Sequence, residues 1–265
     1  MSEHTVLTIP PEVAARVRNQ ERFNAALERA ASLQHPLVAS PERWAVGTGG
    51  ELCCFYPGGT RVDLVPGSVS PSDVAIVGVQ MARAVGAIHS AGLAHGAITA
   101  EALLQTTERG AQLGRFGVFS ALAEGGLGVR DAALALSDAA YVAPEVQDGQ
   151  TPDERSDVFS LGASLYELLT GKPPYGGRTT SFVMASVLIG EGGGRTSGAM
   201  AGPVVDALLR AIEHAPEDRW PTADALAQAL TFGATSAELA TPAPGKRSWL
   251  STIFRSWFPA RRSRG

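Results

Sequence analysis

Residues 157–170 (DVFSLGASLYELLT) constrain the fold most, because they are apolar on almost every side of a helix. A helix of this kind is stable only where neighbouring elements cover all of its faces. Gly171 follows at once, and glycine commonly ends a helix in the left-handed conformation. We therefore expect a buried central helix with a glycine C-cap.

Upstream of this helix, the pattern predicts a small β-containing region. Residues 6–9 form a short apolar run that ends at two prolines, and a helical stretch follows over 13–30 with apolar residues at near-helical spacing. Residues 43–46 and 51–56 are predicted as strands. They flank the glycine-rich residues 47–50, a composition that favours a hairpin.

The rest of the body is predicted to be mainly helical. Ser70 followed by Pro71 is a strong helix start, and this helix should continue to Gly92. Further helices are expected over 180–189, 204–213 and 222–230. The glycine-rich residues 190–202 should form a loop between helices, because they lack the strand and the Gly-Lys-Ser/Thr sequence of a phosphate-binding loop.

The charge distribution separates a basic tail from an acidic body. No acidic residue follows Glu238, so the tail carries +6 and the rest of the chain −10 of the net charge of −4. An acidic body is not expected to bind nucleic acid, and a basic tail is typical of an interaction segment. No apolar run approaches the roughly 20 residues that span a bilayer, and the N-terminus lacks the pattern of a signal peptide.

Cysteine and lysine usage restricts the chemistry further. Cys53 and Cys54 are adjacent, so a disulfide between them would be strained. Buried or half-buried thiols in a reducing, cytoplasmic setting are expected instead. The lysines are Lys172 and Lys246 alone, which excludes any mechanism that needs a lysine in the first 171 residues.

Short motifs occur along the body in a characteristic order. They are Arg22-Phe23, HPLV at 35–38, YVAPE at 141–145, DERSDVFSLG at 153–162, KPPY at 172–175 and APEDRWP at 215–221. In this order and at these separations they resemble the motifs of bacterial serine/threonine protein kinases. The resemblance covers residues 6–232, which is nearly the whole body.

The resemblance implies an α+β fold with two lobes. We expect a truncated, β-containing N-lobe over 1–66 and a mainly helical C-lobe over 67–233. The N-lobe is expected to be truncated because only nine residues precede Pro10, too few for the two strands of the family's glycine-rich hairpin. A linker over 234–245 and a basic amphipathic helix over 246–265 complete the expected organisation.

The catalytic positions that the resemblance identifies have lost their chemistry. The phosphate-anchoring lysine of the family falls at Leu7 and its glutamate partner at Ala26, with Glu28 one register error away. The catalytic base falls at Ala97, and the metal-binding asparagine falls at Ala102. Phosphoryl transfer in this family depends on these positioning and charge-neutralising groups.

Two charged residues also replace functional residues of the family. The metal-binding aspartate falls at Arg115, and this exchange of a carboxylate for a cation should repel Mg²⁺. Asp138 stands where the substrate-facing loop of the family has threonine. We therefore expect an inactive kinase domain with no catalytic residue and no bound cofactor, with metal-free ATP binding as the alternative.

The scaffold residues of the family are retained. Glu145 and Arg219 match a structural ion pair of the large lobe, and Asp157 matches the aspartate that holds the backbone of the catalytic loop. The other retained motif residues are His95, Phe116 and Gly117. His89 together with His95 suggests a metal pair, but no third ligand follows at a suitable spacing, and no metal site is expected.

The tail gathers large apolar side chains on one face of a helix, flanked by arginines. This pattern fits a membrane surface, a groove on a partner protein, or docking on the body of the chain itself. The apolar residues are Trp249, Leu250, Ile253, Phe254, Trp257 and Phe258, and the arginines include Arg255, Arg261 and Arg262.

Taken together, these features favour a pseudokinase that serves as a binding and regulatory scaffold in serine/threonine kinase signalling. The expected partner is an active kinase or a phosphopeptide-binding domain, with an anionic membrane surface as a further contact. The expected location is the cytoplasm, peripheral to the inner face of the membrane. The alternatives are a divergent ATP-binding protein kinase or nucleotide transferase, and an adaptor in which the tail carries the function.

Overall fold

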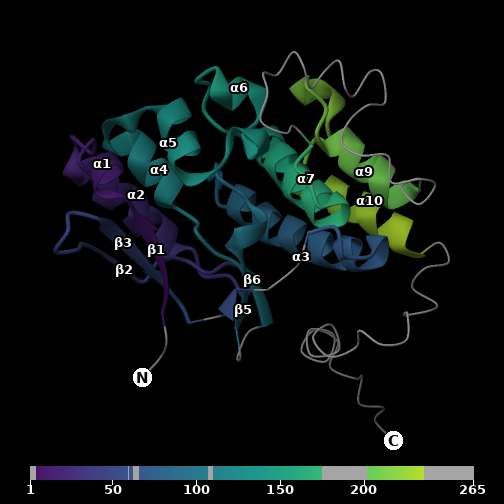
Figure 1. The fold of residues 1–265 in the computed structure, drawn as a ribbon, viewed down its shortest axis with the longest axis horizontal. Coiled ribbons are helices and arrows are strands. Elements are labelled where there is room, and N and C mark those ends of the chain that lie inside the picture. The colour runs from purple at the N-terminus through teal and green to yellow at the C-terminus, as the bar shows by residue number, and fades with distance from the viewer. Residues whose placement is uncertain (1–3, 59, 62–65, 107–109, 175–201, 236–265) are drawn as a thin grey trace, which may run out of the picture.

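The computed structural model describes residues 4–58, 60–61, 66–106, 110–174 and 202–235. A small region with β-strands lies at one side of a larger, mainly helical region (Figure 1). The expected α+β class is therefore confirmed. The predicted helix 180–189, almost all of the predicted loop 190–202 and the tail 246–265 lie outside the described residues.

The small region begins with an antiparallel sheet in the order β1-β3-β2. Its strands are β1 (Thr5–Ile9), β2 (Arg43–Val46) and β3 (Leu52–Tyr56). Side chains of β3 alternate between buried and half-buried, as expected for a sheet with one face on the core. The predicted hairpin is confirmed, because β2 pairs with β3 from Val46 opposite Leu52 to Arg43 opposite Phe55.

The predicted helical stretch 13–30 consists of two helices, α1 (Pro11–Ala14) and α2 (Gln20–Ser32). They separate because the Asn19 side chain caps α2 by accepting a hydrogen bond from the backbone N–H of Arg22 at 3.0 Å. The buried face of α2 carries Phe23, Ala26, Leu27 and Ala30.

A second sheet, which the sequence analysis did not predict, follows in the order β4-β5-β6. Its strands are β4 (Thr60–Arg61), β5 (Leu103–Thr106) and β6 (Gly110–Leu113), and the short helix η1 (Ala100–Ala102) leads into β5. Leu113 ties this sheet to the small region through two backbone hydrogen bonds. It donates to the Leu37 carbonyl at 2.8 Å, and its carbonyl accepts from the Ala39 N–H at 2.9 Å.

The helical region surrounds α7 (Glu154–Thr170), which is buried along most of its length. The prediction of a buried central helix is confirmed, and Gly171 ends it with φ of 80°. The helix starts three residues before the predicted residue 157 because Asp153 and Ser156 form a capping box. The neighbouring helices are α3 (Pro71–Ser90), α9 (Pro203–Ala211) and α10 (Ala223–Thr235).

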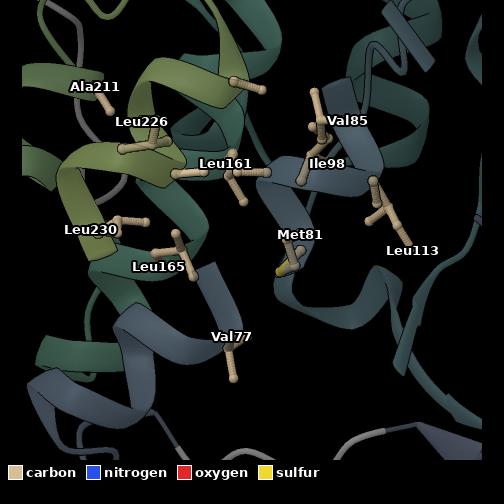
Figure 2. Packing of buried hydrophobic residues seen from close by; sticks show 14 of the residues in the cluster. Val77, Met81, Val85, Ile98, Leu113, Leu161, Leu165, Ala211, Leu226 and Leu230 are labelled. Atoms are coloured by element: carbon tan, nitrogen blue, oxygen red, sulfur yellow. The ribbon is translucent and has the colours of Figure 1, made fainter. Parts of the chain in front are cut away.

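Side chains from these four helices form most of the main core, to which Ile98 and Leu113 also contribute (Figure 2). Gly78 of α3 permits a close approach, because a Cβ atom there would lie 2.7 Å from Leu230 and 2.9 Å from Leu165. α10 continues to Thr235, two residues into the range that was predicted as a linker. The helix extends because Gly233 packs against the backbone of Val204 in α9, where a Cβ atom would lie 2.9 Å from the Val204 nitrogen.

The remaining elements are short. They are α4 (Val118–Leu122), η2 (Ala123–Leu127), α5 (Val129–Leu136), η3 (Ala139–Tyr141), α6 (Pro144–Gln147) and η4 (Pro216–Asp218). Within the described part of the chain, both cysteines are free and no helix is long and apolar enough to cross a membrane.

Candidate functional site

Asp157 organises the loop that the resemblance identifies as the catalytic loop. Its side chain is fully buried in the first turn of α7. One carboxylate oxygen accepts from the His95 N–H at 2.7 Å, and the other accepts from the Gly96 N–H at 2.8 Å. His89 Nε2 lies 2.9 Å from the first of these oxygens. A buried carboxylate with these partners fixes the backbone of the loop at residues 95 and 96.

His95 lies beneath the loop and does not reach a surface. The side chain is fully buried, and its Nε2 lies 3.0 Å from the carbonyl oxygen of Gly114. Its ring packs 6.1 Å from the Phe116 ring. Burial lowers the pKa of His95, so the imidazole is held neutral. The residue therefore serves packing and loop geometry.

The next residue of the loop needs to be glycine. Gly96 has φ of 74°, and a Cβ atom there would lie 2.3 Å from the Phe119 ring. Bulkier residues are excluded on both counts.

Ala97 and Ala102 stand where the resemblance places the base and the metal-binding asparagine, and both are buried. Ala97 is 5% exposed and belongs to the apolar cluster that contains Tyr56, Leu104 and Phe119. Ala102 has no exposed surface and belongs to the main core. At both positions a methyl group packs against apolar neighbours. A carboxylate or an amide there would be removed from water, which is unfavourable.

Arg115 occupies the expected metal-binding position with an unusual backbone conformation, φ of 61°. Its Nη2 lies 2.7 Å from Glu101 Oε2, and its Nη1 lies 3.4 Å from the Thr99 hydroxyl. The guanidinium therefore forms an ion pair with Glu101. It places a positive charge where a metal ion would need a negatively charged ligand. Among the described residues, no group of histidine, cysteine and acidic side chains is arranged to hold a metal ion.

Apolar contacts occupy the positions where the family has its lysine–glutamate pair. Leu7 lies opposite Cys54 in the sheet and packs on the cluster that includes Ala26. Glu28 is exposed on α2, so the alternative register does not supply a partner at this position. Burial, with a smaller contribution from Cys53, raises the pKa of the Cys54 thiol to about 12. This thiol is therefore inert as a nucleophile near neutral pH.

Tyr56 was not identified from the sequence. Its side chain is 1% exposed at the end of β3, and its hydroxyl donates to the Phe116 carbonyl at 3.1 Å. Burial is the main reason that the pKa of Tyr56 is raised well above its ordinary value. The residue fastens the small sheet to the loop that carries Arg115. The available signal was an aromatic residue at the predicted strand end, just before Pro57.

The comparisons with known proteins agree with this architecture. The sequence profile described as the protein kinase domain matches residues 55–193, just over half of the 265 residues. The chain belongs to the protein kinase family. Because the match starts at Phe55, β1, α2 and most of the small sheet lie outside it.

Several bacterial kinases are similar to this kinase-family chain. A probable serine/threonine-protein kinase of Corynebacterium efficiens is 30% identical over 186 residues, covering 67% of this chain and 28% of its own length. PknB of Mycolicibacterium smegmatis is 30% identical over 218 residues, with coverages of 76% and 34%. PknL of Mycobacterium tuberculosis is 34% identical over 191 residues, with coverages of 70% and 46%. The chain thus matches less than half of each of these relatives.

The kinase-family ion pair of the large lobe is present. Arg219 is fully buried and meets Glu145 with two hydrogen bonds of 2.7 and 2.8 Å. It also donates to the carbonyls of Glu213 at 2.7 Å and His214 at 2.8 Å. These bonds tie α6 to the segment before η4. The pair lies away from Ala97 and Arg115 in the sequence and serves the framework.

The structure therefore separates the sequence-predicted residues into two groups. Asp157, His95, Phe116 and Gly117 lie around the loop that the resemblance identifies as catalytic, together with the substituted positions. Glu145 and Arg219 form a second buried cluster. The tail residues from Trp249 to Arg262 lie outside the described residues.

Proposed function

We propose that this kinase-family domain is a pseudokinase, a protein-binding scaffold that does not transfer phosphate. The observation that carries the proposal is the state of Ala97 and Ala102, which are buried within packed apolar surroundings. A catalytic base has to touch the substrate hydroxyl, and neither position offers a polar group or an exposed surface.

The charge at Arg115 supports the same proposal. Phosphoryl transfer needs metal ions that bridge the phosphates, held by carboxylate and amide oxygens. Here the guanidinium takes the place of a metal ligand and is paired with Glu101 at 2.7 Å. A divalent cation at this place would meet the guanidinium instead of a metal ligand, and the Glu101 carboxylate is already paired with that guanidinium. We therefore propose that the domain uses no metal or nucleotide cofactor.

Tyr56 supports a domain that works without nucleotide. Its hydroxyl joins β3 to the backbone of Phe116 directly, with the ring buried in the cluster that contains Ala97. This contact, together with the apolar cluster, holds the small sheet against the loop that carries Arg115. The domain therefore offers a fixed surface for recognition.

The partners that fit this role are an active serine/threonine kinase or a phosphopeptide-binding domain. The basic, aromatic tail would add a contact with an anionic membrane surface, at the inner face of the cytoplasmic membrane. The acidic charge of the body, −10 without the tail, argues against nucleic acid as the ligand.

An active kinase is the competing function, favoured by the relatives that are named serine/threonine-protein kinases. A thermal-shift titration of the full chain with ATP, with and without Mg²⁺ or Mn²⁺, distinguishes the two. A ligand that binds only the folded state raises the melting temperature by mass action. We expect no shift at millimolar ATP with or without metal, and a metal-dependent rise would contradict the proposal.

A further inference from the structure

The small sheet has an open edge at β1. The strand order β1-β3-β2 places β1 at one side of the sheet, and no strand within the described residues pairs with its other side. An edge strand presents unpaired backbone groups to solvent, and folded proteins commonly protect such an edge with lysine, proline or a bulge. The open edge of β1 is therefore a surface that can pair with a further strand.

The sheet register shows which backbone groups of β1 face the open edge. The Gly47 N–H donates to the Glu51 carbonyl at 2.7 Å, so the odd-numbered residues of β3 bond to β2. The even-numbered residues of β3, Cys54 among them, therefore face β1, and the odd-numbered residues of β1 lie opposite them. The N–H and carbonyl groups of Val6 and Thr8 consequently point to the open edge.

The side chains of β1 (TVLTI) carry no charge that would oppose pairing. Val6 is 44% exposed and Thr8 is exposed beside it, whereas Leu7 is half-buried on the other face of the strand. The opposite edge strand, β2, differs because it begins with the exposed Arg43, whose guanidinium lies 3.8 Å from the centre of the Phe55 ring. Of the two edges of this sheet, the β1 edge is thus the one without a charged residue.

Two copies of β1 satisfy each other's open edge when they pair antiparallel about a two-fold axis at Leu7. In this register Val6 of each copy lies opposite Thr8 of the other, and each such pair exchanges both of its N–H···O bonds. Leu7 lies opposite Leu7 of the other copy, in a pair whose side chains approach closely. A register shifted towards Pro10 would lose a donor, because proline has no N–H.

Leucine at position 7 suits this pairing. The resemblance places the family's phosphate-anchoring lysine at Leu7, and two lysines opposite each other across the axis would repel. Two leucines instead remove apolar surface from water, which is favourable. The substitution that removes a catalytic group therefore also permits the edge to pair with a copy of itself.

We propose that the open edge of β1 is a homodimer interface, at which two copies of this chain join their small sheets into one continuous antiparallel sheet. The self-complementary register favours a second copy as the occupant, since a two-fold interface uses the same residues on both sides. The interface does not depend on whether the domain transfers phosphate.

Sedimentation equilibrium of the full chain at concentrations up to about 1 mM tests the interface. We expect the wild type to form a dimer. The double variant Val6→Lys with Thr8→Lys places lysine opposite lysine in both pairs and should weaken the dimer at least about tenfold, as should Val6→Glu with Thr8→Glu. Val6→Lys with Thr8→Glu places opposite charges face to face and should retain the dimer. This last variant also checks that two charged residues on β1 leave the chain folded.

Mixing the double-lysine variant with the double-glutamate variant should restore a dimer that contains one copy of each. Ala45→Lys, on the exposed face of β2, is the matched control and should leave dimer formation unchanged. A wild type that stays monomeric throughout would overturn the proposal and would leave the edge to a strand of another protein. A dimer that the double-lysine variant does not weaken, or a mixture that stays monomeric, would overturn it as well.

Discussion

The buried framework around Asp157 and Arg219 and the candidate catalytic centre around Ala97 and Arg115 differ in how they treat polar groups. In the framework, buried charges are kept and each is met by several hydrogen bonds. In the centre, Ala97 and Ala102 place methyl groups in packed surroundings. The remaining cation, Arg115, has a side chain that is 27% exposed. Buried charge is costly unless it is fully partnered, so it persists where the fold depends on it.

This comparison predicts that the framework is far more sensitive to substitution than the centre. The largest effect should follow from Arg219→Met, which leaves Glu145 partly buried without its partner. Loss of one member of such a pair costs about 3–5 kcal/mol of stability. Chemical denaturation of the full chain measures this loss. The double variant Glu145→Leu with Arg219→Met should lose less, and a loss below about 1 kcal/mol for Arg219→Met alone would break the comparison.

Asp157→Asn should give the next largest loss. The change removes the negative charge that accepts from the N–H groups of His95 and Gly96 and faces His89. Hydrogen bonds to charged groups contribute about 1.5–3 kcal/mol, and we expect a loss in that range in denaturation measurements. Asp153→Asn makes the same chemical change at the N-cap of the same helix, where asparagine caps equally well, so it should be close to neutral.

Ala97→Asp tests the centre directly, because it restores the acidic residue of the family. Burying a polar group in the cluster around Tyr56 and Phe119 should cost about 1–3 kcal/mol, without any gain of phosphate transfer. Ala45→Asp, on the exposed face of β2, is the matched control and should change stability by less than about 0.5 kcal/mol. Equal stabilities of the two variants would show that the centre is open to solvent.

The smallest predicted effect is a pH dependence that involves the two histidines of the framework. Burial lowers the pKa of His89, but the hydrogen bond and charge of Asp157 outweigh it, so the net pKa is raised. The contribution of His89 to stability is therefore complete below the ordinary value near 6.5 and is lost as the pH rises through the raised pKa. His95 has a lowered pKa, so its contribution is lost as the pH falls below about 6.5.

Unfolding free energies measured from pH 5 to pH 8 separate these contributions. The stability difference between the wild type and His89→Asn should shrink as the pH rises, because the wild type loses the His89 contribution. The variant should retain only the acid-side loss from His95. A difference that is constant with pH would contradict the assigned direction of the His89 pKa.

Periodicity and capping residues predicted the helices and the hairpin, because these depend on local contacts. The buried helix α7 and its Gly171 cap follow from residues next to one another in sequence. The sequence pattern did not predict the second sheet, whose strands β5 and β6 are only four residues long each. The helical packing of residues 117–136 was also missed, since small Ala and Gly residues carry little periodic signal.

The motifs predicted which residues form the candidate site, but they did not predict how those residues pack. Ala97 and Arg115 were named from the spacing of the kinase motifs alone. The burial of Ala97 and the role of Tyr56 depend on contacts between β3 and the loop at Phe116, which are 60 residues apart. No local pattern encodes a contact of that kind.

Transfer of the γ-phosphate from labelled ATP by the full chain, with Mg²⁺ or Mn²⁺, tests the central claim most directly. The account predicts no label on the chain itself or on a general protein substrate beyond that of a mock preparation from the same host. Metal-dependent labelling of serine or threonine that exceeds the mock preparation, and that is lost in the Asp157→Asn variant, would contradict it.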